Sequence, residues 1–193
     1  MGPGRYGPVT FRSRDADVGG GDKKDWQKNK KLQAMRWGLV PSFTKPTAKP
    51  DHFIMFNARS ESLHERPAFR RLLESRRCVI LSEGYYEWQQ IDKREKQPYY
   101  IYRENAPLKL AGLYDSWLNE DGELMYTYTI LTTEISPEMS WMHTRMPRYC
   151  QVILTDDGAT RWVSDAKFDT LRDLLVPYRG EDLTWHPVDR KGG

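Results

Sequence analysis

Short apolar and β-branched runs, separated by turn residues, fill most of the chain from Arg36 onward. Runs of this length that are rich in Ile, Val, Tyr and Thr are typical of strands. The pattern predicts six strands, at residues 78–81, 85–89, 99–102, 108–114, 125–132 and 151–154. Between the fourth and the fifth, Asn-Glu-Asp-Gly at residues 119–122 has the composition of a hairpin turn.

Two segments have the spacing of short amphipathic helices. Pro67 suits the first turn of a helix, and an apolar stripe at i, i+3 and i+4 begins at Phe69. Ser164 can cap a second helix over residues 166–175, whose apolar side chains recur on one face. Pro177 would end that helix.

These elements predict an α+β fold that is mainly β. We expect a single domain over residues 1–193, with a curved antiparallel sheet or partial barrel and a few peripheral helices. Hydrophobic residues make up 38% of the chain and charged residues 30%, and the mean hydropathy is -0.78. Apolar runs such as residues 78–81 are far shorter than the ~20 residues of a membrane span. No secretion signal is readable at the start of the sequence.

The first quarter of the chain is basic. Residues 1–51 hold 11 Lys and Arg against 5 Asp and Glu, a net charge of +6, whereas the whole chain has +3. Residues 13–35 combine a Gly triplet with clustered lysines, so we expect a mobile basic loop there. This charge permits a polyanionic partner without requiring one.

Cysteine and histidine usage argues against a metal site. Cys78 and Cys150 are far apart in the sequence, and the four histidines show no helical or finger-type spacing. We therefore expect neither a metal nor another cofactor. Two unpaired cysteines fit a reducing, intracellular compartment.

Four segments place polar residues beside aromatic or conformationally special ones, at residues 35–41, 56–61, 83–88 and 143–147. On the predicted strand, Tyr85 and Glu87 share one face, and Tyr86 and Trp88 share the other. If the first face lines a cleft, desolvation raises the pKa of Glu87 and suits it to proton transfer. Otherwise Glu87 is an ordinary surface carboxylate. His143 can shuttle protons or stabilise an oxyanion, or it can simply be exposed.

The two earlier segments carry candidate nucleic-acid contacts. Arg59 can bind phosphate through two parallel hydrogen bonds, or it can pair with Glu61 on the surface. Asn57 offers a neutral donor and acceptor. Trp37 can stack on a nucleobase while Arg36 holds the backbone, although a Trp in this position can equally belong to the core.

Taken together and in order, these segments resemble the SRAP family, the SOS response-associated peptidases. The motifs are Met-Arg-Trp-Gly-Leu-Val-Pro, Asn-x-Arg-x-Glu, Gly-Tyr-Tyr-Glu-Trp and His-x-Arg-Met-Pro, and the resemblance extends to His186 and Pro187. It implies the SRAP fold and a monomer that shields abasic sites in single-stranded DNA. Such a protein would act in the nucleus of a eukaryote, or in the cytoplasm or nucleoid of a bacterium.

The resemblance also implies roles for individual residues. Glu87 matches the family's acid/base carboxylate, which assists removal of the initiator Met and release of the crosslink. His143 matches the residue that protonates the sugar oxygen, and Asn57 the one that positions the terminal amine and the sugar. The resemblance also implies DNA-binding positions. Some of them hold phosphates, and others lie in the segment that supports the stacked bases and wedges beside the lesion. These positions are Arg36, Trp37, Pro41, Arg59 and Arg145.

The N-terminus departs from the family pattern. In the family, an N-terminal Cys forms a Schiff base with the sugar aldehyde, and its thiol then closes a thiazolidine ring. Here no Cys follows Met1. Either residues 4–6 stand for the family's opening with the Cys lost, or residues 3–9 match a later stretch and the first few dozen residues are missing. We favour the second alignment. Because Cys78 and Cys150 have no free α-amine, we expect no crosslink from this chain.

Two other functions compete with abasic-site processing. The chain could be a non-catalytic module that binds single-stranded DNA through its basic cleft. It could also be a general peptidase that uses Glu87 and His143. A general peptidase would need a nucleophile with a paired base, and the sequence shows none.

Overall fold

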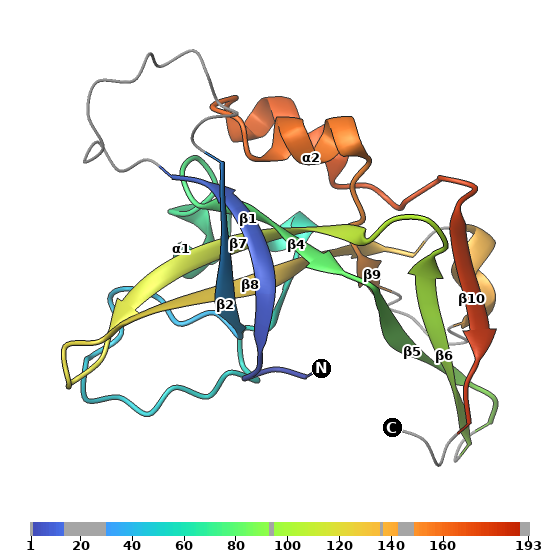
Figure 1. Cartoon of the computed structure of the whole chain (residues 1–193), viewed down its shortest axis with the longest axis horizontal. Coiled ribbons are helices and arrows are strands. Elements are labelled where there is room, and N and C mark those ends of the chain that lie inside the picture. Colours follow the sequence, from blue (N-terminus) through green and yellow to red (C-terminus); the bar gives the residue numbers. More distant parts are fainter. Residues whose placement is uncertain (1, 14–29, 93–94, 136, 143–148, 190–193) are drawn as a thin grey trace.

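In a computed structural model of the protein, five strands form a barrel and a smaller sheet lies beside it (Figure 1). The structure describes residues 2–13, 30–92, 95–135, 137–142 and 149–189. The barrel consists of β1 (Tyr6–Arg12), β2 (Lys30–Trp37), β4 (Arg77–Ser82), β7 (Leu108–Leu118) and β8 (Leu124–Glu134). Its order is β2-β1-β4-β7-β8, and β2 returns to pair with β8. This closing pair is parallel, whereas the other barrel pairs are antiparallel.

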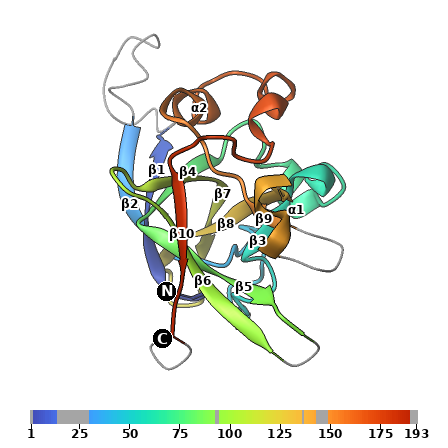
Figure 2. The same ribbon diagram turned by 90° about the vertical axis from the view of Figure 1, so that its right-hand side faces the viewer.

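Two short strands extend the barrel along β8. Strand β3 (Asn57–Arg59) pairs with β8 in parallel, and β9 (Tyr149–Gln151) pairs with it antiparallel. The second sheet has the order β10-β6-β5, with β5 (Gly84–Gln90), β6 (Lys96–Arg103) and β10 (Leu183–Pro187). Figure 2 shows this sheet facing the viewer in front of the barrel. Strand β5 is therefore an edge strand whose free side is available to line a site.

Strand β4 of the barrel wall is buried on both faces. Cys78 and Ile80 pack inside the barrel, while Val79 packs outside against the helical segments. The outer layer contains η1 (Ser60–Ser62), α1 (Pro67–Arg70), α2 (Asp156–Trp162) and η3 (Phe168–Leu174). A further 3-10 turn, η2 (Pro137–Met142), packs against the second sheet. Burial on both faces explains why β4 reads as a continuous apolar run instead of an alternating one.

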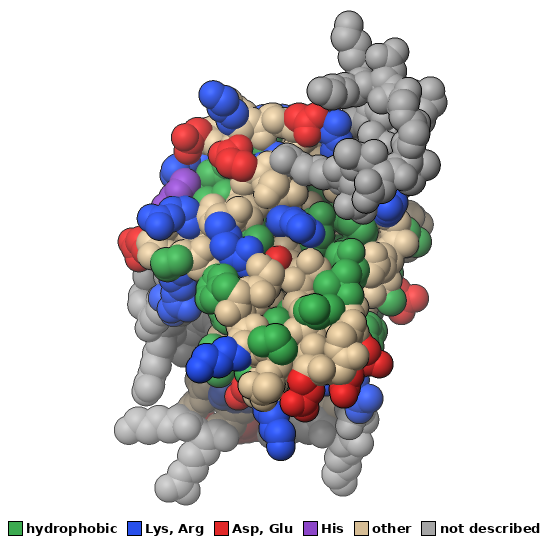
Figure 3. All heavy atoms as spheres, turned by 90° about the vertical axis from the view of Figure 1, so that its left-hand side faces the viewer, with side chains coloured by type: hydrophobic (Ala, Val, Ile, Leu, Met, Phe, Trp, Pro, Cys, Tyr) green, Lys and Arg blue, Asp and Glu red, His purple; other side chains and the backbone are tan. Residues whose placement is uncertain are grey.

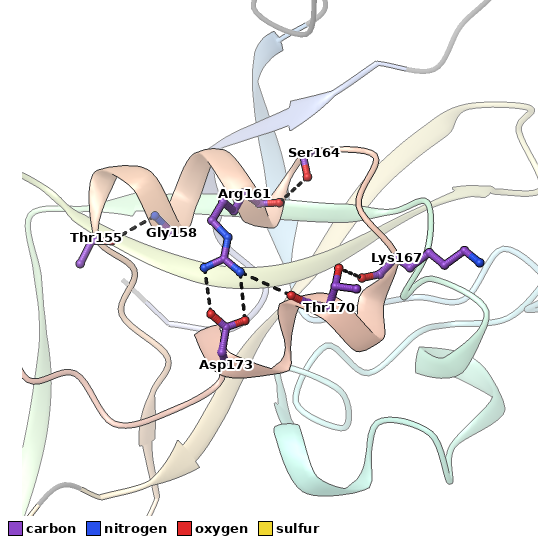
Figure 4. A network of polar contacts seen from close by, with 7 residues as sticks. All are labelled: Thr155, Gly158, Arg161, Ser164, Lys167, Thr170 and Asp173. Atoms are coloured by element: carbon purple, nitrogen blue, oxygen red, sulfur yellow. Dashed lines mark hydrogen bonds and ion pairs between the residues drawn. The ribbon is translucent and has the colours of Figure 1, made fainter.

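Helix α2 and η3 are held together by polar contacts (Figure 4). The hydroxyl of Thr155 caps α2 by accepting a hydrogen bond from the Gly158 backbone N–H at 3.0 Å. Arg161 reaches from α2 to Asp173 on η3 with Nη–Oδ distances of 2.8 and 3.1 Å. From beneath them, the fully buried Trp162 donates its Nε1–H to barrel carbonyls. The two elements thus form one layer against the barrel.

The mainly β, α+β prediction is confirmed, and so are five of the predicted strands, most of which are longer than predicted. The hairpin turn between β7 and β8 is also confirmed, with the Gly122 N–H donating to the Asn119 carbonyl at 3.1 Å. The sixth strand is shifted: β9 covers Tyr149–Gln151, and of the predicted remainder Ile153 makes an isolated bridge to Leu110.

Several expectations need correction. Strands β1, β2, β3 and β10 were not predicted, and residues 30–35, expected in a loop, belong to β2 because they pair along β1. The rest of that expected loop, residues 14–29, lies outside the described residues. Ser164 caps no helix over 166–175; the segment forms η3 instead, and the Ser164 hydroxyl accepts from the Ala166 N–H. Helix α1 begins at Pro67 as predicted.

Candidate nucleic-acid interface and active site

Strand β8 gathers the predicted site residues. Trp37 of β2 lies opposite Tyr128, and Asn57 of β3 lies opposite Ile130. Arg59 follows Asn57 by two positions on β3. Residues directly opposite each other on paired strands project from the same face, and so do residues two apart on one strand. Trp37, Asn57 and Arg59 therefore share one face of the sheet, although the segments that carry them are about 20 residues apart in the sequence.

The three side chains on this face differ in their surroundings. The indole Nε1–H of Trp37 donates to the Phe56 carbonyl at 2.8 Å, which fixes one edge of the ring in the fold. The Oδ1 atom of Asn57 is buried and has no hydrogen-bond partner. Arg59 is exposed, whereas Ala58 between them is buried in the core. The face thus offers an anchored aromatic ring, a neutral acceptor and a surface cation.

A cavity of about 320 Å³ opens where this face meets the second sheet. The barrel contributes apolar side chains to its wall, β5 contributes its free edge, and β9 contributes a single polar residue. The residues that matter below are Trp37, Tyr128 and Ile130 from the barrel, Tyr85 and Trp88 from β5, and Gln151 from β9. Gly2 and Pro3 also line the cavity. Its walls are mostly apolar, which favours a ligand with few charges inside.

Glu87 lies on the same edge strand. Tyr86 and Trp88 are 47% and 50% exposed, whereas Glu87 is less exposed than either, as strand alternation predicts. Burial raises the pKa of Glu87, and this effect outweighs the Trp88 N–H and the charge of Lys96, which both lower it. Glu87 does not itself line the cavity but follows Tyr85 and Tyr86 along the edge that does. The carboxyl group therefore keeps its proton to a higher pH than an exposed glutamate, which favours a role in proton transfer.

The segment leading to the remaining candidates is anchored beside β5. Met142 is fully buried with Ile101 and Met139, and Tyr85 packs against this cluster. The Gln89 amide donates to the Trp141 carbonyl at 3.3 Å. His143 and Arg145 lie outside the described residues, so the roles that the resemblance implies for them stay predictions.

The loop after β2 contains the predicted site residue Pro41. Pro41 is buried, and the role of its segment in supporting the bases beside the lesion stays a prediction. The same loop exposes Phe43 (65%), Phe53 (64%) and Ile54 (69%). Sequence reasoning missed these residues because they lie outside any periodic element; their apolar character in a loop of Pro, Lys and Thr was the available signal.

Arg36 borders a second, open hollow of about 400 Å³ beside this loop. Its Nε–H donates to the Gly4 carbonyl at 2.9 Å, and Arg5 and His52 line the same hollow. Burial lowers the pKa of His52, whose Nδ1 lies 2.7 Å from the Gly38 carbonyl. Because a carbonyl can only accept, Nδ1 carries the proton. The two arginines are therefore the cations that this hollow offers to an anion.

Basic and apolar side chains occur together on the molecular surface. Figure 3 shows one face on which Lys and Arg interleave with apolar side chains, while Asp and Glu gather toward its edges. Elsewhere in the structure, the Arg71 guanidinium lies over the exposed Phe43 ring, 5.1 Å from its centroid. Cations and exposed rings in combination are the means by which proteins hold single-stranded nucleic acid.

Two other kinds of site were sought in the described part of the chain. There, no three His, Cys, Asp or Glu side chains come together in a way that could hold a metal ion. Nor does any helix of that part combine the length and apolar character that a membrane crossing requires.

The barrel, its flanking sheet and this site define a class of protein. The family model described as "SOS response associated peptidase (SRAP)" matches residues 1–192. The chain therefore belongs to the SRAP family, as its four motifs indicated.

Relatives and solved structures agree with this assignment. The chain is 39% identical over 165 residues to the abasic site processing protein YobE of Bacillus subtilis, covering 83% of this chain and 72% of that protein. It is 35% identical over 178 residues to the abasic site processing protein HMCES of Xenopus tropicalis, covering 81% and 52%. A crystal structure of a protein from Bordetella bronchiseptica superimposes with a TM-score of 0.78 at 27% identity, covering 98% of this chain and 86% of that one.

Proposed function

We propose that this chain recognises abasic sites in single-stranded DNA, as an intracellular monomer, and transfers protons at the exposed sugar. The main support for this proposal is the strand register along β8, which brings Trp37, Asn57 and Arg59 to one face beside the cavity. The names of the relatives support the same lesion. The cavity is mostly apolar and has a volume of about 320 Å³, and the sugar of the lesion would lie in it.

The DNA would follow the surface outside the cavity. Arg59 and Arg36 would hold phosphates on either side of the lesion, with Arg145 as a third candidate. Neighbouring bases would stack on exposed rings, for which Trp88 at the cavity and Phe43 and Phe53 on the loop are available. These contacts tolerate any sequence, as a lesion sensor requires, because every base has a π face.

Glu87 would supply the proton transfer. Burial raises its pKa, so that it keeps its proton to a higher pH than an exposed glutamate and would act as an acid and, after losing the proton, as a base. Asn57 would orient the sugar through its free acceptor oxygen. His143 would complete the set by protonating the sugar oxygen.

The thiazolidine crosslink that the family resemblance implies needs a thiol and a free amine on adjacent carbons. Cys78 and Cys150 are both internal and buried, so neither supplies this group. The residues named above would carry out recognition and proton transfer.

Fluorescence anisotropy and gel electrophoresis test this proposal together. Labelled single strands with and without one abasic site, and the matching duplex, are titrated with the 193-residue chain at several salt concentrations. We expect tightest binding to the abasic single strand and slow cleavage of that strand. Equal affinity for abasic and intact strands would overturn the proposal. Specific binding with no cleavage would instead favour the non-catalytic DNA-binding module.

Arg59→Ala is expected to weaken binding to all single strands alike and to reduce the salt slope by about 1, since one phosphate contact is lost. Arg66→Ala, exposed just before α1, is the matched control and should leave affinity unchanged. An unaltered slope in Arg59→Ala would remove this residue from the interface.

A further inference from the structure

The cavity contains polar atoms that the fold leaves unpaired. Within the described residues, five buried side-chain atoms have no hydrogen-bond partner, and three of them belong to the site: Asn57 Oδ1, Tyr85 OH and Gln151 Oε1. A buried polar atom without a partner destabilises the fold, and such atoms are rare. Two of these side chains, Tyr85 and Gln151, line the cavity, where a bound ligand would supply the missing partners.

Strand geometry places these atoms around the cavity. Tyr85 and Gln151 both line it, from β5 and β9 respectively. Gln151 lies opposite Thr132 on β8, and Arg59 lies opposite the same Thr132 on the other side. Gln151 therefore projects from the same face as Arg59 and Asn57. Tyr85 approaches from the second sheet, so that the polar atoms come from both walls.

The hydrogen-bonding groups of Tyr85 and Gln151 restrict which chemical groups a ligand can place between them. A phenol both donates and accepts a hydrogen bond, whereas Gln Oε1 only accepts. Both side chains are neutral, and the remaining wall is largely apolar. Among the described side chains that line this cavity, a phosphate would find no cation. A hydroxyl, which donates once and accepts as well, complements both groups.

We propose that Tyr85 and Gln151 recognise the hydroxyl that an abasic site carries at C1, where an intact nucleotide carries its base, together with the C4 hydroxyl of the ring-opened sugar. The inference rests on the proposed function and adds the recognition element that separates a missing base from a present one. The sequence did not indicate a binding role for either residue. A Tyr in an aromatic run and a Gln before an apolar run are both typical of residues that serve the fold.

Three single-stranded probes test the pair by equilibrium binding. The first contains a borohydride-reduced abasic site, which keeps the hydroxyls at C1 and C4 and cannot react through an aldehyde. The second contains a tetrahydrofuran spacer, which lacks both hydroxyls, and the third is intact. We expect the wild-type chain to bind the reduced site about fivefold to tenfold more tightly than the spacer, as one or two neutral hydrogen bonds allow.

Tyr85→Phe and Gln151→Met should each reduce this preference to about twofold or less while leaving affinity for the spacer unchanged. Tyr6→Phe is the matched control, since Tyr6 is exposed on β1 and lines neither the cavity nor the second hollow, and it should keep the full preference. If both cavity variants keep the wild-type preference, the inference is overturned. If the wild-type chain binds all three probes equally, the proposed function itself fails.

Thermal unfolding without DNA provides an independent test. Because the Tyr85 hydroxyl has no partner in the fold, its removal should leave the melting temperature unchanged or raise it. A lower melting temperature of Tyr85→Phe would show that the hydroxyl has an internal partner, and the inference would fail on that ground too.

Discussion

Glu87 illustrates how a single side chain acquires its chemistry from its place on a strand. Its neighbours Tyr86 and Trp88 are half exposed, so the opposite side of β5, which carries Glu87, is turned from water. Loss of solvation disfavours the carboxylate and raises its pKa. Lys96 opposes this effect but does not cancel it. The fold thus holds a group in a state that is unfavourable for stability and useful for proton transfer.

Glu87→Gln should therefore stabilise the protein in a pH-dependent manner. A raised pKa in the folded state means that the folded chain binds more protons than the unfolded chain between the two pKa values. Wild-type stability accordingly falls as pH rises through that window, from about 4.5 upward. We expect the variant to melt at a higher temperature than wild type at pH 7 and to show a smaller difference at pH 4.

Thermal unfolding from pH 4 to pH 8 measures this effect, with the exposed Glu61→Gln as a control that should shift little. A difference between Glu87→Gln and wild type that stays constant across the range would rule out a raised pKa. In the cleavage assay, the same Glu87→Gln variant should bind the abasic strand and cleave it more slowly.

At the scale of elements, the turn after β2 positions the loop that carries Phe43 and Phe53. Gly38 has φ of +107°, a conformation that favours glycine, and a Cβ atom there would lie 2.2 Å from the His52 carbonyl oxygen. The loop is then tied to the barrel by the Ser42 N–H, which donates to Asp115 Oδ2 at 2.7 Å. A close backbone approach and a buried carboxylate together fix a segment that has little regular structure.

Gly38→Ala is expected to destabilise the protein by about 2–4 kcal/mol, because strain at positive φ and a backbone clash add. Gly122→Ala is a close control: its φ is +77°, but nothing lies within 4 Å of the added Cβ. That variant should cost only about 1 kcal/mol. Urea unfolding of both variants measures the difference, and equal losses would show that contact with His52 contributes nothing.

At the scale of the whole molecule, Arg77 joins the barrel to its helical layer. The side chain is buried at the start of β4, and its guanidinium donates to the carbonyls of Trp162, Ser164 and Ala166 at 2.6, 2.6 and 2.8 Å. It also donates to the Leu73 carbonyl, after α1. One planar group with five donors thus satisfies chain segments that no strand ladder reaches.

Replacing Arg77 by Met, which keeps much of the apolar stem, should reduce the free energy of unfolding by about 3 kcal/mol, since several buried carbonyls lose their donors. Arg77→Lys should recover only part of this loss, because an ammonium group cannot reach all four carbonyls at once. The exposed Arg70→Met serves as the control in the same urea titrations. If Arg77→Lys has the stability of the wild type, the planar arrangement of donors in the guanidinium does not contribute to stability.

The sequence predicted the central strands because their side chains are buried on at least one face, and burial selects apolar residues in a recognisable pattern. It failed for β2, whose side chains are mostly exposed and polar, so that no periodicity marks the strand. It also failed for β3, which is three residues long and is fixed by pairing with β8. Strands stabilised by their neighbours leave little signal in their own residues.

For the site, the sequence by itself determined the residue types and, through strand alternation, which of them share a face. Tyr85 and Glu87 on one side of β5 follow from a period of two and needed no coordinates. Only the tertiary structure decided that Trp37 and Asn57 meet along β8, and that Gln151 faces the same cavity as Tyr85. Alternation is a local property of the backbone, whereas strand partners are selected by the packing of the whole barrel.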